Sequence, residues 1–202
     1  MNPGLFVCYN GFGDSMERIE KQMEFILEID KEKQIKRKTL QSNGKDFEDD
    51  AQHAWHMAIM TLLLNEYANE EIDVLKTISM LLIHDLVEID AGDTYAYDSQ
   101  GLKTQSKREN LLPEDQAKKM FDLWNEFEER KTAEAKFARV LDNFQPVMLN
   151  AATDGRMWVE NGVHLEQILK RNEKTHEGSE VLWKYMYEHF IMPNVEKKRI
   201  KR

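Results

Sequence analysis

The chain has 202 residues, 41% of them hydrophobic and 32% charged, and is long enough to form one domain with a sizeable core. Its formal net charge of −9 disfavours general binding to a nucleic acid polymer or to an anionic membrane, because both require a basic protein surface. The single cysteine, Cys8, excludes an internal disulfide and any cysteine-based metal motif.

Apolar residues recur at intervals of three and four along most of the chain, and this period predicts an all-α fold, a compact bundle of several helices. No convincing run of strict apolar–polar alternation indicates a strand. The first helix is predicted to start at a Ser15 cap and to continue through Ile35 to about Leu40, where residues 41–44 break it.

Two further helices are predicted before the middle of the chain. One runs from about Asp50 to Ala68, and the other starts at an Asp73 cap and reaches His84. Residues 90–110 are polar and interrupted by glycine, so we interpret them as a long active-site loop.

Four more helices are predicted in the second half of the chain. Their start signals are, in chain order, Pro113 at the first helical position, a Thr132 cap, Gly162 and a Ser179 cap. The last helix is expected to stop before Pro193, and the basic end from Glu196 to Arg202 is expected to fray.

The pattern predicts a single helical domain over residues 15–192, with an N-terminal extension of residues 1–14 and a basic tail of residues 193–202. Residues 1–15 lack the basic segment and apolar run of a secretory signal, and no apolar stretch approaches the roughly 18 residues of a membrane span. We therefore expect a cytoplasmic protein. Three aromatic residues could form a homodimer face or, equally well, part of the core: Trp158, Trp183 and Tyr187.

The run from Ile83 to Thr94 is the part of the sequence richest in potential metal ligands. It contains the doublet His84-Asp85 and three more carboxylates, directly after an apolar helical stretch. His53 and Asp142, on two other predicted helices, add an imidazole and a carboxylate. Oxygen ligands suit Mg and Mn, and imidazole shifts the preference toward Mn, Fe, Co, Ni or Zn. The pattern therefore indicates a site for a divalent cation.

Structural interpretations of the same residues stay open. A His-Asp pair commonly ends a helix with a solvated carboxylate, and Asp142 could be a buried cap or an ion-pair partner. The apolar turn before the doublet is expected to be buried, however, and a charged Asp85 at its edge would be costly without a partner.

The order and approximate spacing of these residues resemble those of the HD-domain metal-dependent phosphohydrolases. The similarity to the 5′-deoxynucleotidase-like branch of that family covers roughly residues 20–190 and is strongest in three segments: Ala51–His56, His84–Thr94 and Ala138–Asp142. Gln52 stands where this branch usually has Glu. Asp46 and Phe47 stand where a basic residue is usual, so that Lys45 or Arg37 would have to serve instead.

The resemblance implies an HD-type helical bundle that hydrolyses the phosphate monoester of a 2′-deoxynucleoside 5′-monophosphate. It also implies one bound divalent cation (Mn, Co, Fe, Ni, Mg or Zn), held by four residues: His53, His84, Asp85 and Asp142. Expected partners are therefore a small nucleotide substrate and neither a nucleic acid polymer nor a membrane.

Four further residues receive roles from the resemblance. Glu88 matches the catalytic acidic residue, and it could orient or deprotonate water if the helix continues one turn beyond His84. Asp93 matches a second active-site carboxylate, which could also accept a hydrogen bond from a sugar hydroxyl. Arg37 is the nearest match to a family arginine that helps hold the substrate, and it could form a two-pronged contact to phosphate, although the basic run around it equally suits a solvated face. Trp55 is a candidate to shape the substrate pocket.

Two alternative functions stay open. One is an HD hydrolase of another phosphorylated metabolite, such as a nucleoside polyphosphate. The other is a non-catalytic helical binding protein stabilised by a metal ion, which would need neither Glu88 nor Asp93.

Overall fold

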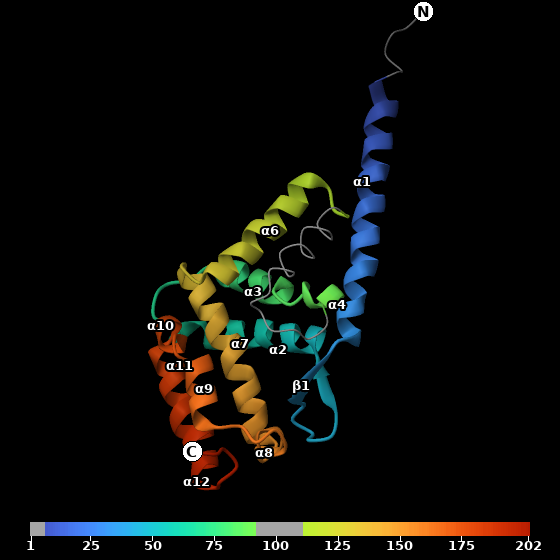
Figure 1. The fold of residues 1–202 in the computed structure, drawn as a ribbon. Helices are drawn as coiled ribbons and strands as arrows, with labels where there is room; N and C mark the ends of the chain where they lie inside the picture. Colours follow the sequence, from blue (N-terminus) through green and yellow to red (C-terminus); the bar gives the residue numbers. More distant parts are fainter. Residues whose placement is uncertain (1–6, 92–110) are drawn as a thin grey trace, which may run out of the picture.

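The computed structural model describes residues 7–91 and 111–202, which form a mainly helical molecule (Figure 1). Its α-helices are α1 (Val7–Ile29), α2 (Asp50–Leu64), α3 (Val74–Ile83), α4 (Glu88–Ala91), α6 (Glu114–Glu129), α7 (Ala133–Ala152), α8 (Arg156–Glu160), α9 (Leu165–Arg171), α10 (Thr175–Gly178), α11 (Glu180–Met186) and α12 (Met192–Glu196). The predicted all-α class is confirmed.

Shorter elements connect these helices. Two are 3₁₀ helices, η2 (Asp30–Gln34) and η3 (Asn65–Tyr67), and one is a π-helical segment, η4 (Tyr187–Ile191). Strands β1 (Lys36–Leu40) and β2 (Phe47–Asp49) form an antiparallel hairpin between α1 and α2. Residues 92–110, most of the predicted active-site loop, lie outside the described residues.

Helix α7 lies at the centre of the fold, where it contacts α2, α3, α6, α10 and α11. Its apolar residues recur at helical spacing, and Phe137, Val140 and Leu141 are completely buried. Because α2, α3 and α7 meet in this core, polar side chains on their inner faces are forced close together.

Side-chain caps begin several of the helices, as the sequence predicts. Asp73, Thr132 and Ser179 each accept a hydrogen bond from the backbone N–H three residues later, at the starts of α3, α7 and α11. A cap of this kind stabilises a helix by roughly 1 kcal/mol. Pro113 occupies the N-cap position of α6, one residue before the predicted place.

The predicted extent of the first helix is wrong at both ends. It begins at Val7 instead of at a Ser15 cap, and it stops at Ile29 instead of near Leu40. Ile35 is extended, with φ −85° and ψ 113°, and the next five residues pair with β2. The predicted breaker at residues 41–44 is the turn of this hairpin, with Gly44 at φ 65°.

The predicted end of the chain is also wrong. The helix continues past Pro193, which lies in the first turn of α12, where a missing N–H costs no hydrogen bond. The basic tail does not fray: Ile200 is 1% exposed, and Lys201 exchanges backbone hydrogen bonds with Val163 and Leu165 at 2.9 and 2.7 Å. The tail is therefore held by a buried apolar side chain, by these backbone bonds and by the ion pair of Arg199 with Asp154 at 2.8 Å.

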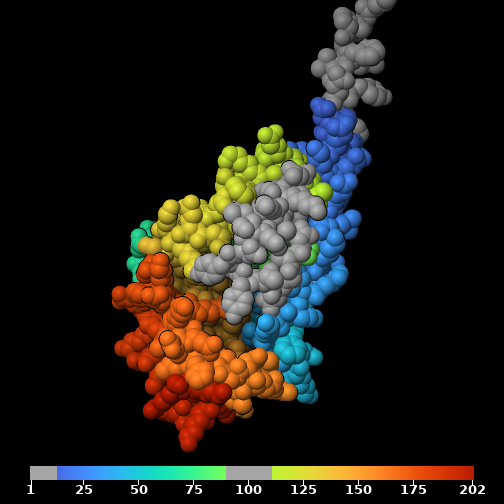
Figure 2. All heavy atoms as spheres, in the orientation of Figure 1, coloured from blue at the N-terminus to red at the C-terminus, as the bar shows by residue number. Residues whose placement is uncertain are grey.

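Helix α1 lies along one side of the molecule and projects beyond the other helices (Figures 1 and 2). Its inner side packs on a small apolar cluster that includes Phe25, Leu86 and Leu112. Trp158 is buried in the main core, and Trp183 and Tyr187 pack against that core. None of the helices in the described part of the chain is long and apolar enough to cross a membrane.

Candidate metal centre

Three of the four predicted metal ligands meet in the core between three helices. His53 comes from α2, His84 follows the last residue of α3, and Asp142 comes from α7. Their exposures are 0%, 4% and 4%, and one ligand atom from each lies within 4.8 Å of the other two. The Asp142 Oδ1 atom is 3.3 Å from His53 Nε2 and 3.7 Å from His84 Nε2. This spacing allows all three residues to bind one cation.

Both imidazole rings are oriented by a hydrogen bond at Nδ1. The Nδ1 atom of His53 lies 3.0 Å from Gln145 Oε1, and that of His84 lies 2.9 Å from the carbonyl oxygen of Leu81. Because both partners are acceptors, each Nδ1 carries the proton and each Nε2 faces Asp142. Metal-binding histidines are held in this way, with one nitrogen bonded to an acceptor and the other free for the ion.

Asp85, the fourth predicted ligand, lies beside this group. Its Oδ2 atom is 3.0 Å from His84 Nε2, without the alignment of a hydrogen bond. The second oxygen of Asp142 accepts a hydrogen bond from Arg139 Nη1 at 2.8 Å, which leaves Oδ1 facing the two imidazoles. The donor set of imidazole nitrogens and carboxylate oxygens fits a divalent transition metal.

Charges in the cluster favour a cation at its centre. Burial lowers the pKa of His84, but the adjacent Asp85 and Asp142 carboxylates outweigh burial and raise the pKa to about 10. Burial would raise the pKa of Asp142, yet contacts with both histidines lower it well below its ordinary value. The carboxylates thus draw protons onto the rings. A divalent cation meets the same demand for positive charge while the rings stay neutral.

Arg37 reaches the same cluster from strand β1. Its Nη1 atom donates to Asp85 Oδ2 at 2.6 Å and to Asp50 Oδ1 at 2.8 Å, and its side chain is 15% exposed. The basic run around Arg37 therefore does not form a solvated face throughout, because this residue points inward. Of the two basic residues considered from the sequence, Arg37 contacts a predicted ligand, whereas Lys45 is exposed in the hairpin turn.

The sequence model for the HD domain matches residues 29–183 of this chain, a span that includes the whole cluster. The chain belongs to the HD domain family. The doublet after which such domains are named is His84-Asp85 here, in the turn between α3 and α4.

Two solved structures resemble this HD-domain protein. One is titled a predicted metal-dependent phosphohydrolase from Magnetospirillum magnetotacticum; it is 39% identical, with 92% of this chain and 97% of that chain covered and a TM-score of 0.86. The other, a conserved hypothetical protein from Pyrococcus furiosus, shares the fold, with 20% identity, 88% and 98% coverage and a TM-score of 0.57.

Curated relatives of the HD-domain chain carry the name 5′-deoxynucleotidase HDDC2. The protein from Bos taurus is 31% identical over 105 residues, which are 48% of this chain and 49% of that relative. The protein from Dictyostelium discoideum is 31% identical over 140 residues, 62% and 74% of the two chains. The chain spans about half the length of the first of these relatives.

Glu88 follows the HD doublet, but it does not lie on the same helix as the residues before His84. Helix α3 ends at Ile83, residues 84–87 form a turn, and Glu88 is the first residue of α4. The helix therefore does not continue past His84, and a backbone bond of 2.9 Å from Glu88 N–H to the Asp85 carbonyl closes the turn instead. The Glu88 side chain is half-buried. Asp93 lies outside the described residues.

Trp55 is not brought to the cluster. Two residues after His53, it lies about 200° further around α2. Its side chain is 63% exposed, and its ring stacks on His56 with centroids 6.1 Å apart. Gln52 has a structural role: it completes a capping box with Asp49 at the start of α2.

Several polar residues around the cluster were not assigned to it from the sequence. Gln145, completely buried, binds His53 and donates to Glu48 Oε1 at 2.5 Å. Its position three residues after Asp142, on the same face of α7, is a signal that could have identified it. Glu32 gave no such signal, because it lies in a charged run. It is nevertheless 8% exposed, and burial, with the charges of Asp85 and Asp50, raises its pKa to about 7.

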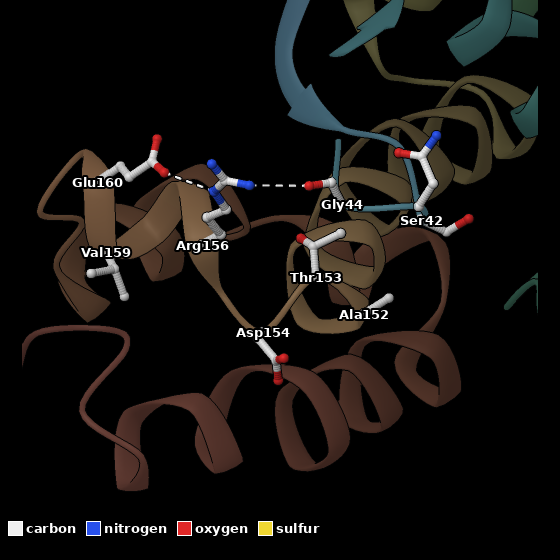
Figure 3. A pocket seen from close by; sticks show the side chains of 9 residues that line it. Ser42, Gly44, Ala152, Thr153, Asp154, Arg156, Val159 and Glu160 are labelled. Carbon is white, nitrogen blue, oxygen red and sulfur yellow. Dashed lines mark hydrogen bonds and ion pairs between the residues drawn. The ribbon is translucent and has the colours of Figure 1, made fainter. Parts of the chain in front are cut away.

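A separate surface hollow of about 580 Å³ lies between the hairpin turn, the end of α7 and α8 (Figure 3). None of the candidate metal ligands lines it. Arg156 in its wall donates to Glu160 at 2.9 Å and to the Gly44 carbonyl at 3.1 Å. Because this arginine is paired within the chain, we assign no ligand to the hollow.

Proposed function

We propose that this protein is a metal-dependent phosphomonoester hydrolase that converts 2′-deoxynucleoside 5′-monophosphates to deoxynucleosides and phosphate. The observation that carries the proposal is the buried cluster in which two imidazole Nε2 atoms face one carboxylate oxygen, with Arg37 beside it. The names of the curated relatives support the choice of substrate. A cytoplasmic location stays a prediction from the sequence.

In this proposal His53, His84, Asp85 and Asp142 hold one divalent cation. Such a cation polarises phosphoryl oxygens and makes water a better nucleophile at neutral pH. Arg37 binds a phosphate oxygen, which positions the ester and offsets its charge. Glu88 accepts a proton from the attacking water as the new P–O bond forms and the bond to the 5′ oxygen breaks. Asp93 is proposed to bind the sugar or to assist transfer of a proton to the leaving oxygen.

The substrate class is tested by phosphate release. We expect kcat/KM for a deoxynucleoside monophosphate to exceed that for the ribonucleotide with the same base by about 10–100-fold, if the pocket leaves the extra hydroxyl unpaired or lacks room for it. Both substrates should be assayed with the same cation after chelation and readdition of Mn, Co, Mg or Zn.

Other outcomes of that assay support the alternatives. Equal kcat/KM values, or activity on polyphosphates alone, would reject the deoxynucleotidase proposal and favour an HD hydrolase of another phosphorylated compound. Stoichiometric metal binding with no turnover of any phosphate ester would favour a metal-stabilised binding protein.

We also propose that the chain forms a homodimer, through surfaces on α1 and α2 instead of the aromatic residues considered from the sequence. Supporting this are large apolar side chains that are 39–66% exposed and spaced along one side of each helix: Met16, Ile19, Met23 and Ile26 on α1, and Trp55, Ile59, Leu62 and Leu63 on α2. Such stripes on two helices suit a self-complementary interface.

The homodimer proposal is tested by the solution mass. We expect light scattering to give twice the mass of the 23.9 kDa chain. The double variant Met23→Glu with Leu62→Glu should have the mass of a single chain, because each subunit of the dimer would bury two charges without partners. Val181→Glu, an equally exposed apolar site on α11, is the matched control. A monomer in the unmodified protein would refute the homodimer.

A further inference from the structure

A buried carboxylate that is not among the predicted metal ligands contacts Arg37. Asp50 is the first residue of α2 and is completely buried. Its Oδ1 atom accepts a 2.8 Å hydrogen bond from Arg37 Nη1, the nitrogen that also donates to Asp85. Arg37 is therefore held between one candidate ligand and one residue outside the candidate ligand set.

The other two nitrogen atoms of the guanidinium group, Nε and Nη2, make no hydrogen bond with the described residues. The Arg37 Nε atom faces Glu48 Oε2 at 4.0 Å and makes no hydrogen bond. The Nη2 atom makes no hydrogen bond with any described residue. Because Nη1 already donates to two carboxylates and Nε is buried, Nη2 is the part of Arg37 that is available to a phosphate oxygen of a substrate.

Asp85 cannot by itself keep Arg37 in this orientation. In the proposed function its oxygens bind the cation, and they are then shared between the cation and the guanidinium. Asp50 has no such competing role. It lies three residues before His53 on the same helix, so α2 fixes the arginine and a metal ligand relative to one another.

Stability alone is a poor explanation for Asp50. Its Oδ2 atom is buried and makes no hydrogen bond, and a buried ion pair is often no more stabilising than apolar residues of similar size. Building on the proposed function, we propose that Asp50 is a positioning residue that holds Arg37 with its Nη2 edge toward the phosphate group of the substrate.

The test is the affinity of the manganese-loaded protein for inorganic phosphate, measured by calorimetry. Asp50→Val removes the acceptor and fills the buried space with apolar groups, so we expect a folded protein. It should bind phosphate about tenfold more weakly, with unchanged metal content. Asp50→Asn keeps an acceptor oxygen and should restore most of the affinity.

A double-substitution cycle separates positioning from a general effect of charge. Arg37→Ala should weaken phosphate binding at least as much as Asp50→Val, and the two together should be no worse than Arg37→Ala alone, because Asp50 acts through Arg37. Asp46→Ala removes the same charge from the exposed hairpin turn and should leave the affinity unchanged.

Four results would overturn or separate these ideas. Normal phosphate affinity in Asp50→Val, or additive losses in the double variant, would overturn the positioning role. Normal affinity in Arg37→Ala would overturn both that role and the proposed phosphate contact. If the variants lose phosphate affinity as expected but the deoxynucleotide assay shows no preference for the deoxynucleotide, only the proposed substrate would be rejected.

Discussion

His84→Ala is expected to remove the bound divalent cation and phosphate release together. The Nε2 atom of His84 faces the buried Asp142 and the half-buried Asp85, so its loss removes a neighbour that both carboxylates share. Loss of a group that only supports a ligand commonly costs about 10–100-fold in metal affinity, and loss of a ligand itself should cost more. Metal content after gel filtration and phosphate release should be measured on the same sample.

The control for this substitution is His176→Ala. His176 is exposed, its backbone carbonyl accepts a hydrogen bond from Asn69, and its side chain makes no hydrogen bond with any described residue. The His84 ring packs on Phe127 at 5.0 Å, so circular dichroism must show that the variant is folded. A folded His84→Ala protein that keeps its metal ion would remove His84 from the ligand set.

Features that depend on nearby residues could be predicted from the sequence. Helical spacing and the caps Asp73, Thr132 and Ser179 located most of the helices, because a cap bonds to a backbone group only three residues away. The meeting of His53, His84 and Asp142 was predicted for a different reason: imidazole and carboxylate ligands suit a divalent cation, and their order and spacing resemble those of the HD-domain phosphohydrolases.

Features that depend on distant partners were missed. Strand β1 has a basic, unpatterned sequence, and it is extended because it pairs with β2 and because Arg37 meets Asp50 and Asp85. The C-terminal tail is ordered by Ile200, a single apolar residue in a basic run. Local sequence propensity does not include contacts with distant residues, so tertiary packing determines the conformation of both segments.

The environment of the metal cluster was predicted only in part for the same reason. Gln145 shares a helix face with Asp142, so its place could have been inferred from spacing. Glu32 is brought to the cluster by the chain path from α1 through η2 to β1, and nothing within its charged run indicates burial.

Glu88→Ala is expected to leave the metal content unchanged and to lower kcat strongly. Glu88 begins α4 directly after the turn that carries His84 and Asp85, which places a half-buried carboxylate next to the candidate metal centre in the chain. Removal of a positioned acid–base group commonly costs about 10²–10⁴ in rate. The measurement is kcat at saturating substrate, with the bound metal counted in every preparation.

Glu114→Ala is the matched control, because Glu114 is also the first residue of its helix but is exposed on α6. Glu88→Gln keeps the size of the side chain and its ability to form hydrogen bonds but cannot accept a proton from water at neutral pH. If Glu88 acts as a base, the glutamine variant should be as slow as the alanine variant. If Glu88 only supports the turn between α3 and α4, glutamine should restore turnover, and the catalytic role would be rejected.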